Sequence, residues 1–381
     1  MIAADRAADK CEVHIFEKGK TVGRKFLVAG KGGFNLTNRA TGAELLAHYT
    51  KHPLIRRALE KFGTEETRRY FADLGIPTFI GSSGRVFPER GIKPVQVLQA
   101  LKKRLRAKGV VFHLRHEFVG FTEDMRPRLN GGDITITPEA DAYVFALGGA
   151  SWSVTGSTGD WLAHFAEKSI PVLPFAPSNC GVNVDWSPAF REKYAGQPLK
   201  NVAVTCRDKT VKGEVMISEY GLEGNAIYPL SPQIRESLRR GETPILHFDF
   251  KTQNSENQLL TKISGKKITP KNYGYLFNLN KSHLAFLKQF TTKEDYLSPQ
   301  KFIVKIKKLP VPVRDLRPIE EAISVVGGID LSAVTEDFAL RAHPHLYVIG
   351  EMLNWDAPTG GFLLQGCFST AVRGAEGILG E

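Results

Sequence analysis

The feature that most constrains the fold is a short uncharged run near the C-terminus, residues 346–349, which ends directly in Gly350 and Glu351. A strand of Leu, Tyr, Val and Ile without charge is expected where both faces of a parallel sheet are covered. Downstream, the paired glycines Gly360 and Gly361 let backbone approach a ligand closely, and the N–H groups that open the next helix favour an anionic partner. The run therefore predicts an α/β fold with a nucleotide or flavin site at the end of this strand.

Three further blocks accompany this run along the chain. They are the glycine-rich loop 22–38, the strand and Gly-Gly turn 141–151, and the segment 316–329. Together with residues 346–366, these blocks resemble the HI0933-like, or YhiN/BaiN, family of bacterial FAD-dependent oxidoreductases. Four spaced blocks in the family's order are far more specific than a lone glycine motif, and they cover nearly the whole chain.

The resemblance implies the fold class and the domain organisation. We expect an α/β protein with a Rossmann-like, glutathione-reductase-like FAD-binding domain and an inserted β domain that carries a small helical insertion. The FAD-binding domain would comprise residues 1–177 and 323–381, the inserted β domain residues 178–250 and 309–322, and the helical insertion residues 251–308. A length of 381 residues fits two or three domains.

Local patterns predict several elements. Helices are expected at 53–61, at 64–74 with Thr64 as N-cap, and from Pro94 to about residue 108. Short strands are expected at 13–17, 110–114, 117–121, 126–129 and 134–136. The crowded prolines Pro171, Pro174 and Pro177 are expected to break regular structure and mark a linker. Further helices are expected at 282–290 and 299–308.

The resemblance also implies which residues contact FAD. Glu17 would bond the adenosine ribose hydroxyls, and Glu351 would contact the ribityl chain. The other expected cofactor residues lie in the glycine-rich loop, one strand, two turns and the start of the last helix: Gly23, Arg24, Lys25, Lys31, Gly32, Asn35, Thr37, Val119, Ala146, Gly148, Gly149, Gly350, Gly360, Gly361, Phe362 and Leu363. From composition alone, a surface loop, a solvent-facing Glu351 and a structural Gly-Gly turn would explain the same residues. No catalytic residue is assigned; Arg85, Tyr220 and Tyr228 are either pocket residues or residues of the core or the rim.

One block of the family is missing. Family members open with a strand and a Gly-x-Gly-x-x-Gly turn that places the FAD pyrophosphate on a helix N-terminus. Here residues 1–10 resemble the tail of the helix after that turn, and residues 13–17 resemble the second strand. Either the recorded start lies downstream of the natural one, or the chain is a degenerate relative with weakened flavin binding. We favour the first, because the rest of the site is kept in detail.

Charge and composition bear on partners. The chain has a formal charge of +11, and its densest basic clusters, 102–108 and 301–308, are interleaved with apolar residues as in solvated helix faces. We therefore expect no nucleic-acid partner, while the surplus of positive charge would attract acidic substrates or nicotinamide phosphates.

No run of about 18 apolar residues or signal-like start is present, so no membrane partner and a cytoplasmic location are expected. The four cysteines are widely spaced, and His113 and His116 would point to opposite strand faces, so no metal site is expected.

The functional expectation comes from the resemblance. It implies an FAD-dependent oxidoreductase that passes hydride from NAD(P)H through flavin to a small organic substrate, with reduction of a conjugated double bond as one form of this chemistry. No separate nicotinamide-binding unit is visible in the sequence. The alternative is a non-catalytic relative that keeps the fold as a binding module, for example for RNA.

Overall fold

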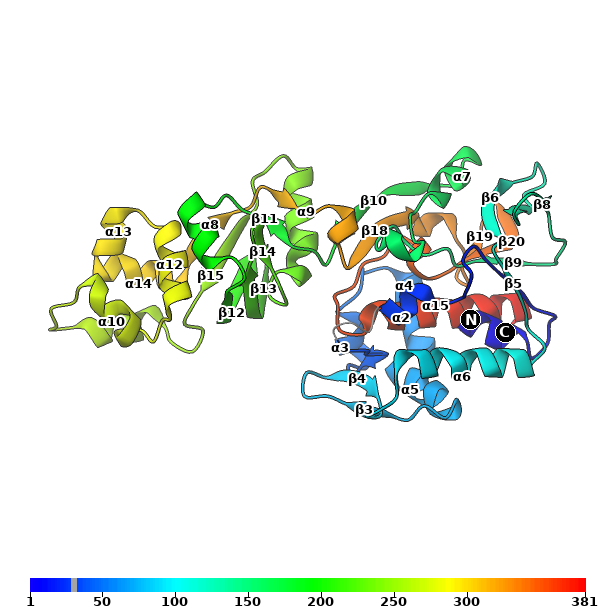
Figure 1. The fold of residues 1–381 in the computed structure, drawn as a ribbon, viewed down its shortest axis with the longest axis horizontal. Helices are drawn as coiled ribbons and strands as arrows, with labels where there is room; N and C mark the ends of the chain where they lie inside the picture. Colours follow the sequence, from blue (N-terminus) through cyan, green and yellow to red (C-terminus); the bar gives the residue numbers. More distant parts are fainter. Residues whose placement is uncertain (29–32) are drawn as a thin grey trace. The chain divides into compact units, whose positions relative to one another are not determined.

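The computed structural model describes residues 1–28 and 33–381. It divides into two compact units, each of which is described by itself (Figure 1). Unit 1 comprises Met1–Ala176 and Ser324–Glu381, and unit 2 comprises Pro177–Ile323. Lys31 and Gly32, both expected to contact FAD, lie outside the described residues.

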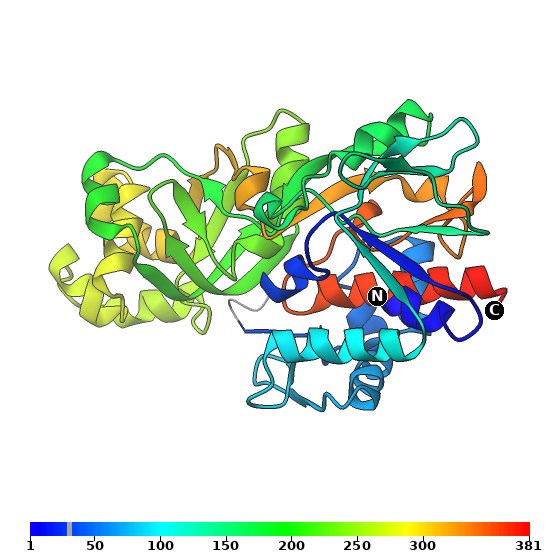
Figure 2. The ribbon, with the colours of Figure 1, turned by 45° about the vertical axis from the view of Figure 1, so that its right-hand side comes forward.

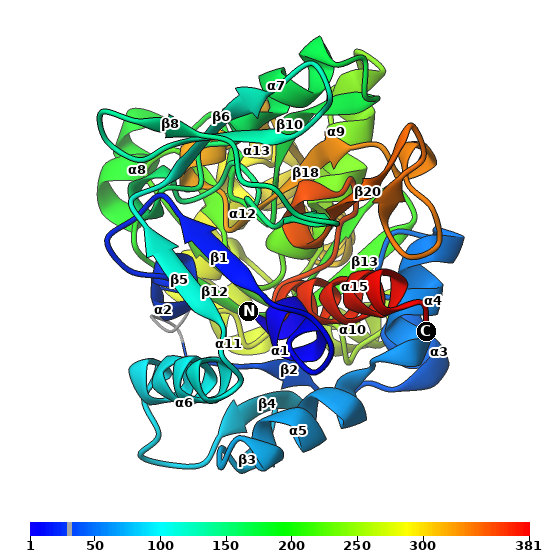
Figure 3. The same ribbon diagram turned by 90° about the vertical axis from the view of Figure 1, so that its right-hand side faces the viewer.

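Two parallel strand pairs form the framework of unit 1. Strand β1 (His14–Glu17) pairs with β5 (Val111–Leu114), and the two lie side by side in Figure 3. Strand β20 (His343–Val348) pairs in parallel with β9 (Tyr143–Phe145) and antiparallel with β19 (Ala339–Leu340). Parallel pairs joined through helices confirm the expected Rossmann-like α/β class.

The helices of unit 1 surround a long C-terminal helix, α15 (Phe362–Leu379). It is apolar on most sides, as expected of a buried helix, and it contacts α1 (Ile2–Ala7) and α4 (Pro53–Lys61). Figure 2 shows α1 between α15 (red) and α6 (cyan, Pro94–Ala107). The remaining helices of unit 1 are α2 (Arg24–Val28), α3 (Gly42–Leu46), α5 (Thr64–Asp73) and α7 (Trp161–Glu167).

Helices α4 and α6 confirm their predicted positions, but the expected cap of α5 is wrong. The N-cap is Gly63, and Glu66 Oε2 accepts from the Gly63 N–H at 3.0 Å. Thr64 is already helical, and its hydroxyl donates to the Ala40 carbonyl at 3.0 Å. The bond from the Gly63 N–H to the Glu66 side chain therefore replaces the threonine cap that the sequence suggested.

Two small antiparallel sheets complete unit 1. One has the order β2 (Thr37–Asn38), β4 (Arg85–Pro88), β3 (Thr78–Ile80). The other has the order β6 (Glu117–Phe121), β7 (Pro127–Asn130), β8 (Thr135–Ile136). The predicted strands in 110–136 are confirmed to within two residues at either end.

The proline cluster does not break regular structure. Pro174 and Pro177 lie inside strand β10 (Val172–Ser178), which pairs with β18 (Ser324–Ile329) in a two-stranded sheet. Each strand of such a pair has one edge outside the ladder, where a residue without an N–H is tolerated. The predicted break in regular structure is therefore wrong, although the division between the two units does fall here, between Ala176 and Pro177.

Unit 2 is built on a seven-stranded sheet. Its order is β16–β15–β12–β13–β14–β11–β17, and its strand pairs are antiparallel. The strands are β11 (Val182–Asn183), β12 (Pro198–Cys206), β13 (Lys209–Ile217), β14 (Gly221–Glu223), β15 (Ile245–Asp249), β16 (Leu309–Pro312) and β17 (Asp315–Leu316). Helices α8 (Pro188–Tyr194) and α9 (Ser231–Arg239) belong to the same unit.

A group of short helices lies between β15 and β16 in the sequence, drawn in yellow-green to yellow in Figure 1. They are α10 (Glu256–Ile263), α11 (Tyr273–Leu276), α12 (Lys281–Gln289), α13 (Lys293–Leu297) and α14 (Pro299–Lys307). The last two predicted helices, 282–290 and 299–308, are confirmed to within one residue. We call residues 251–308 the helical module. None of the helices described in either unit is both long and apolar enough to span a bilayer.

Candidate flavin site

One ammonium group joins three of the predicted segments. Lys25, on α2, donates from Nζ to Glu351 Oε2 at 2.7 Å and to the hydroxyls of Ser151 and Ser157 at 3.3 Å each. Glu351 lies in the 3-10 turn Gly350–Met352 that follows β20, and both serines follow β9. The Lys25 and Glu351 side chains are only 30% and 17% exposed. We call Lys25, Ser151, Ser157 and Glu351 the lysine cluster.

The Gly-Gly turn after β9 is held from two sides. Gly148 has φ 78°, and its carbonyl accepts from Trp161 Nε1 at 2.9 Å. The Gly149 carbonyl accepts from the Ser157 hydroxyl at 2.6 Å, and a Cβ at Gly149 would lie 2.5 Å from a methyl carbon of Val325. Glycine is therefore required at Gly148 by backbone conformation and at Gly149 by packing. Ser157 links the turn to Lys25.

The second glycine turn is tied to α15. Gly350 has φ 72°, its N–H donates to the Thr370 hydroxyl at 3.0 Å, and its carbonyl accepts from Trp355 Nε1 at 2.9 Å. A Cβ at Gly350 would lie 3.6 Å from Cys367 Sγ. Burial, and then the charge of Glu351, raise the pKa of the Cys367 thiol. A raised pKa favours the protonated form of this thiol, which makes Cys367 a weak nucleophile.

A second group of polar contacts surrounds the start of α15. When the side-chain amide of Asn35 is oriented so that both its oxygen and its nitrogen have a hydrogen-bond partner, the oxygen accepts from the Gly361 N–H at 2.6 Å. Asn38 Nδ2 donates to the Gly360 carbonyl at 3.0 Å. A Cβ at Gly360 would lie 3.7 Å from Arg85 Nε, so a cation borders the same place. The first-turn N–H groups of a helix have no partners inside the helix and carry its positive dipole end. We call Asn35, Asn38, Arg85, Gly360 and Gly361 the helix-entry group.

The aromatic residue that opens α15 is fixed by its neighbours. The Phe362 ring is stacked on His48 with centroids 4.1 Å apart, and the Phe362 carbonyl accepts from the Tyr49 hydroxyl at 2.6 Å. Leu363, the next predicted contact, is half-buried. The helix start is thus held by contacts from the turn that follows α3 as well as from β2.

Other predicted residues have structural tasks of their own. A Cβ at Gly23 would lie 2.7 Å from Leu98 Cδ1, so this glycine allows close packing on α6. Arg24 donates to the Val154 carbonyl at 3.3 Å. Thr37 is fully buried, and its hydroxyl donates to Gln365 Oε1 at 2.6 Å. The Thr37 side chain therefore faces the protein interior.

Three predicted residues, Glu17, Val119 and Ala146, belong to neither the lysine cluster nor the helix-entry group. Glu17 ends β1, and its Oε1 accepts from the Gly19 N–H at 2.7 Å. Val119 lies at the register shift between Phe118 and Gly120 in β6. Ala146 is exposed directly after β9. Within the described part of the chain, Glu17 and Val119 share no hydrogen bond with the lysine cluster or the helix-entry group.

Sequence reasoning did not assign Ser157 or Gln365, and it left Arg85 open. Gln365 Oε1 accepts from the hydroxyls of Thr37 and Thr67 at 2.6 and 2.8 Å, and Nε2 donates to the Phe62 carbonyl at 2.9 Å. A lone glutamine in the apolar first turns of this helix, residues 362–368, is the signal that would have found it, because a buried amide is retained only when it is hydrogen-bonded. No comparable signal marks Ser157.

Replacing Gln365 with leucine is expected to lower the free energy of unfolding by about 3 kcal/mol, because Thr37 and Thr67 lose their buried acceptor. Denaturant unfolding measures this change. Thr67→Val is the matched control, since Gln365 Oε1 keeps its bond from Thr37 and no buried group is orphaned; about 1 kcal/mol is expected. Equal losses for the two variants would show that Gln365 is not the centre of this network.

The expected arrangement of the histidines is wrong. The His113 and His116 rings meet edge to face with centroids 6.0 Å apart, because β5 ends at Leu114 and Arg115 turns the chain with φ 61°. His113 Nε2 lies 2.8 Å from His14 Nδ1. Within the described residues, no group of three or more His, Cys, Asp or Glu side chains is arranged to hold a metal ion.

A surface cavity of about 730 Å³ lies elsewhere in unit 1, around α3 and α4. It is lined among others by Leu46, Lys51, Ile55 and Glu60, and by no residue of the lysine cluster or the helix-entry group. Its volume would suit a ligand, but it holds none of the predicted flavin residues. The glycine turns therefore remain the better candidate for the flavin site.

Parallel strands that end in glycine turns, a half-buried ammonium–carboxylate pair and the N-terminus of a helix define a dinucleotide-binding protein of the flavoprotein class. The HI0933-like protein Rossmann domain family matches residues 1–377, and the chain belongs to this family. It is an FAD-dependent oxidoreductase, and its cofactor is FAD. The resemblance inferred from the four sequence blocks is confirmed.

Two curated relatives and one solved structure illustrate the similarity. A 3-dehydro-bile acid delta(4,6)-reductase of Clostridium scindens is 26% identical over 97% of this chain and 93% of the relative. A ribosomal RNA dihydrouridine synthase of Escherichia coli is 25% identical over 96% of this chain and 92% of the relative. A quinol-fumarate reductase structure has a TM-score of 0.48 at 14% identity and covers 99% of this chain and 68% of that chain.

Proposed function

We propose that this chain reduces a carbon–carbon double bond conjugated with a carbonyl group, using NAD(P)H as the electron donor and a small organic molecule as the substrate. The observation that carries the proposal is that both kinds of curated relative, matched over more than nine-tenths of their length, are named for the same bond chemistry. A delta(4,6)-reductase of a 3-dehydro compound acts on double bonds conjugated with a ketone. A dihydrouridine synthase saturates the ring double bond of uracil, which is conjugated with a carbonyl.

We assign the lysine cluster and the helix-entry group to opposite ends of the flavin part of FAD. Glu351 and Lys25 offer a carboxylate and an ammonium group for the ribityl hydroxyls and the adjoining phosphate. Arg85 and the first N–H groups of α15 provide positive charge for the pyrimidine end. Glu17 keeps one carboxylate oxygen for a ribose, because Gly19 occupies the other. Bound FAD supplies the hydride transfer itself.

Two cations of unit 1 are suited to the phosphates of the cofactor. We assign phosphate contacts to Arg24 and Lys25, because a cation offsets phosphate charge and bonds phosphate oxygens strongly. Both lie on α2, next to the loop that follows the ribose-side strand β1.

A test of the reaction uses the purified protein with FAD under anaerobic conditions. NAD(P)H should bleach the flavin band near about 450 nm. A 3-oxo-4-ene steroid should restore it at least about 100-fold faster than the matched saturated ketone, because only the enone has a conjugated β-carbon that can accept the hydride. Rapid-mixing absorbance measures both steps. The proposal fails if reduced flavin is stable toward every conjugated substrate tried.

The same chemistry on a uracil base within RNA is the second candidate. It is favoured by the relatives named as ribosomal RNA dihydrouridine synthases and by the positive charge of the chain. In the assay above, a uridine oligonucleotide would then restore the flavin band, and a dihydrouridine oligonucleotide would not. This pair of oligonucleotides separates the two candidates.

A further inference from the structure

The basic surplus of the chain is concentrated in the helical module. Residues 251–308 hold twelve lysines and three acidic residues, a surplus of nine, against +11 for the whole chain. No acidic residue occurs between Glu256 and Glu294. An ordinary solvated helix face carries charges of both signs, so this module requires another explanation.

Part of this charge is neutralised locally and part is not. On α14, Lys301 and Lys305 pair with Asp295 of α13, and Lys307 pairs with Asp249. In contrast, Lys262, Lys266, Lys267 and Lys271 are all exposed. Among the described residues these four form no ion pair with a carboxylate; Lys266 bonds only the Lys262 carbonyl, at 3.1 Å.

An exposed aromatic side chain follows these four lysines. Tyr275 is 95% exposed, whereas Tyr273 is fully buried and stacked on Phe302 with centroids 4.0 Å apart. The buried Tyr273 anchors the short helix α11 to the module core and leaves Tyr275 in solvent. We call Lys262, Lys266, Lys267, Lys271 and Tyr275 the lysine–tyrosine surface.

We propose that the lysine–tyrosine surface binds single-stranded RNA, with the lysines contacting phosphates and Tyr275 stacking on a base. Unpaired cations and an exposed ring, which here follow one another along one short segment of the chain, are the two components of single-strand recognition. A membrane surface would require a broad apolar face, but in the helical module the large apolar side chains exposed besides Tyr275 are Leu297 and Val304. This inference departs from the expectation of no nucleic-acid partner. That expectation was based on the basic clusters 102–108 and 301–308 and did not consider the lysine–tyrosine surface.

The first test removes the four charges. Lys262→Gln, Lys266→Gln, Lys267→Gln and Lys271→Gln are combined, and binding of a labelled uridine oligonucleotide is followed by fluorescence anisotropy. At physiological salt the affinity should fall about 100-fold. The slope of log affinity against log salt should become shallower by about 3, because each of the four lost phosphate contacts on a single strand contributes about 0.7 to that slope. Binding is read without turnover, so this test is independent of the proposed reaction.

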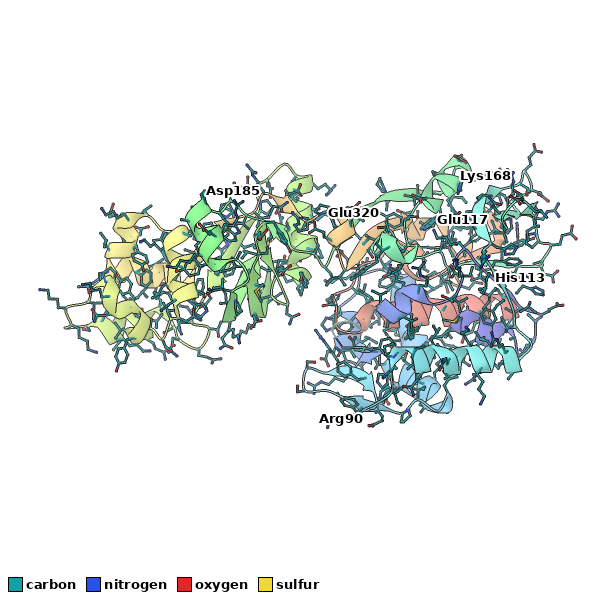
Figure 4. The ribbon with its side chains drawn as sticks, in the orientation of Figure 1. Arg90, His113, Glu117, Lys168, Asp185 and Glu320 are labelled. Carbon is teal, nitrogen blue, oxygen red and sulfur yellow. The ribbon has the colours of Figure 1, made fainter. Side chains whose placement is uncertain are left out.

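A matched variant separates location from total charge. Arg90, Lys93, Lys103 and Arg106 are exposed cations of unit 1, and Figure 4 labels Arg90 at the edge of that unit. Replacing these four with glutamine removes the same charge and should change RNA affinity by less than about threefold, because the residual effect is long-range and screened. An equal loss in both quadruple variants would overturn the assignment.

The second test examines the ring. Tyr275→Ala should weaken RNA binding about tenfold, and Tyr275→Phe should bind as the wild type does, because stacking needs the ring and not the hydroxyl. Phosphatidylserine vesicles serve as the competing anionic probe. The proposal is overturned if Tyr275→Ala binds RNA unchanged, or if vesicles bind this surface more tightly than RNA does.

Discussion

Lys25→Met should weaken FAD binding about 100-fold. The Lys25 ammonium group bonds Glu351 and lies within 3.3 Å of two serine hydroxyls, so its loss releases three segments that are far apart in the sequence. It also leaves the carboxylate of Glu351 without its cation in a place that is only 17% exposed. Truncating one partner of a shielded charge pair costs about 2–5 kcal/mol, and the remaining exposure places this pair at the lower end. The dissociation constant is measured by the quenching of flavin fluorescence.

Two further variants separate a direct contact from a general loss of stability. Lys20→Met removes an exposed lysine from the preceding loop and should leave the dissociation constant within about twofold. Lys25→Met combined with Glu351→Gln removes the orphaned charge, so the free energy of unfolding should recover while FAD binding stays weak. Stoichiometric FAD with wild-type affinity in Lys25→Met would refute the assignment of the lysine cluster.

Local sequence determined much of this framework in advance. The uncharged run before Gly350 formed a strand, and the paired glycines formed the turn before α15. Such features depend on backbone conformation and short-range burial, which the residues themselves set. Pro174 shows the limit of that approach. A proline disfavours a strand interior only where a ladder needs its N–H, and the sequence does not reveal which edge of a strand is free.

The partners of the site residues could not be predicted in the same way. Lys25 and Glu351 are 326 positions apart, and nothing local pairs them. The side chain of Thr37 was expected to contact flavin, but it bonds Gln365, which is 328 positions away. A threonine beside a glycine loop suits either task, and only packing determines which way it turns. The resemblance pointed to a loop, whereas the roles of its side chains depend on the tertiary structure.

Gly361→Ala should be among the most damaging single-methyl changes in unit 1. Gly361 has φ 102°, and an added Cβ would lie 2.2 Å from the Thr37 carbonyl oxygen. The left-handed conformation alone costs a residue with a side chain about 1–2 kcal/mol. The clash is with backbone of β2, which cannot move aside as a side chain can. We expect a loss of at least about 3 kcal/mol in the free energy of unfolding, together with loss of FAD.

The opposite end of the same helix provides the control. Gly380 follows α15 with φ 70°, but an added Cβ there meets no atom within 4 Å. Gly380→Ala therefore carries the conformational strain without the clash and should cost about 1 kcal/mol, with FAD content unchanged. Denaturant unfolding and the flavin absorbance of each purified variant give the two readouts. If the two substitutions proved equally harmful, the close approach of α15 to Thr37 would not be what fixes the flavin end of the site.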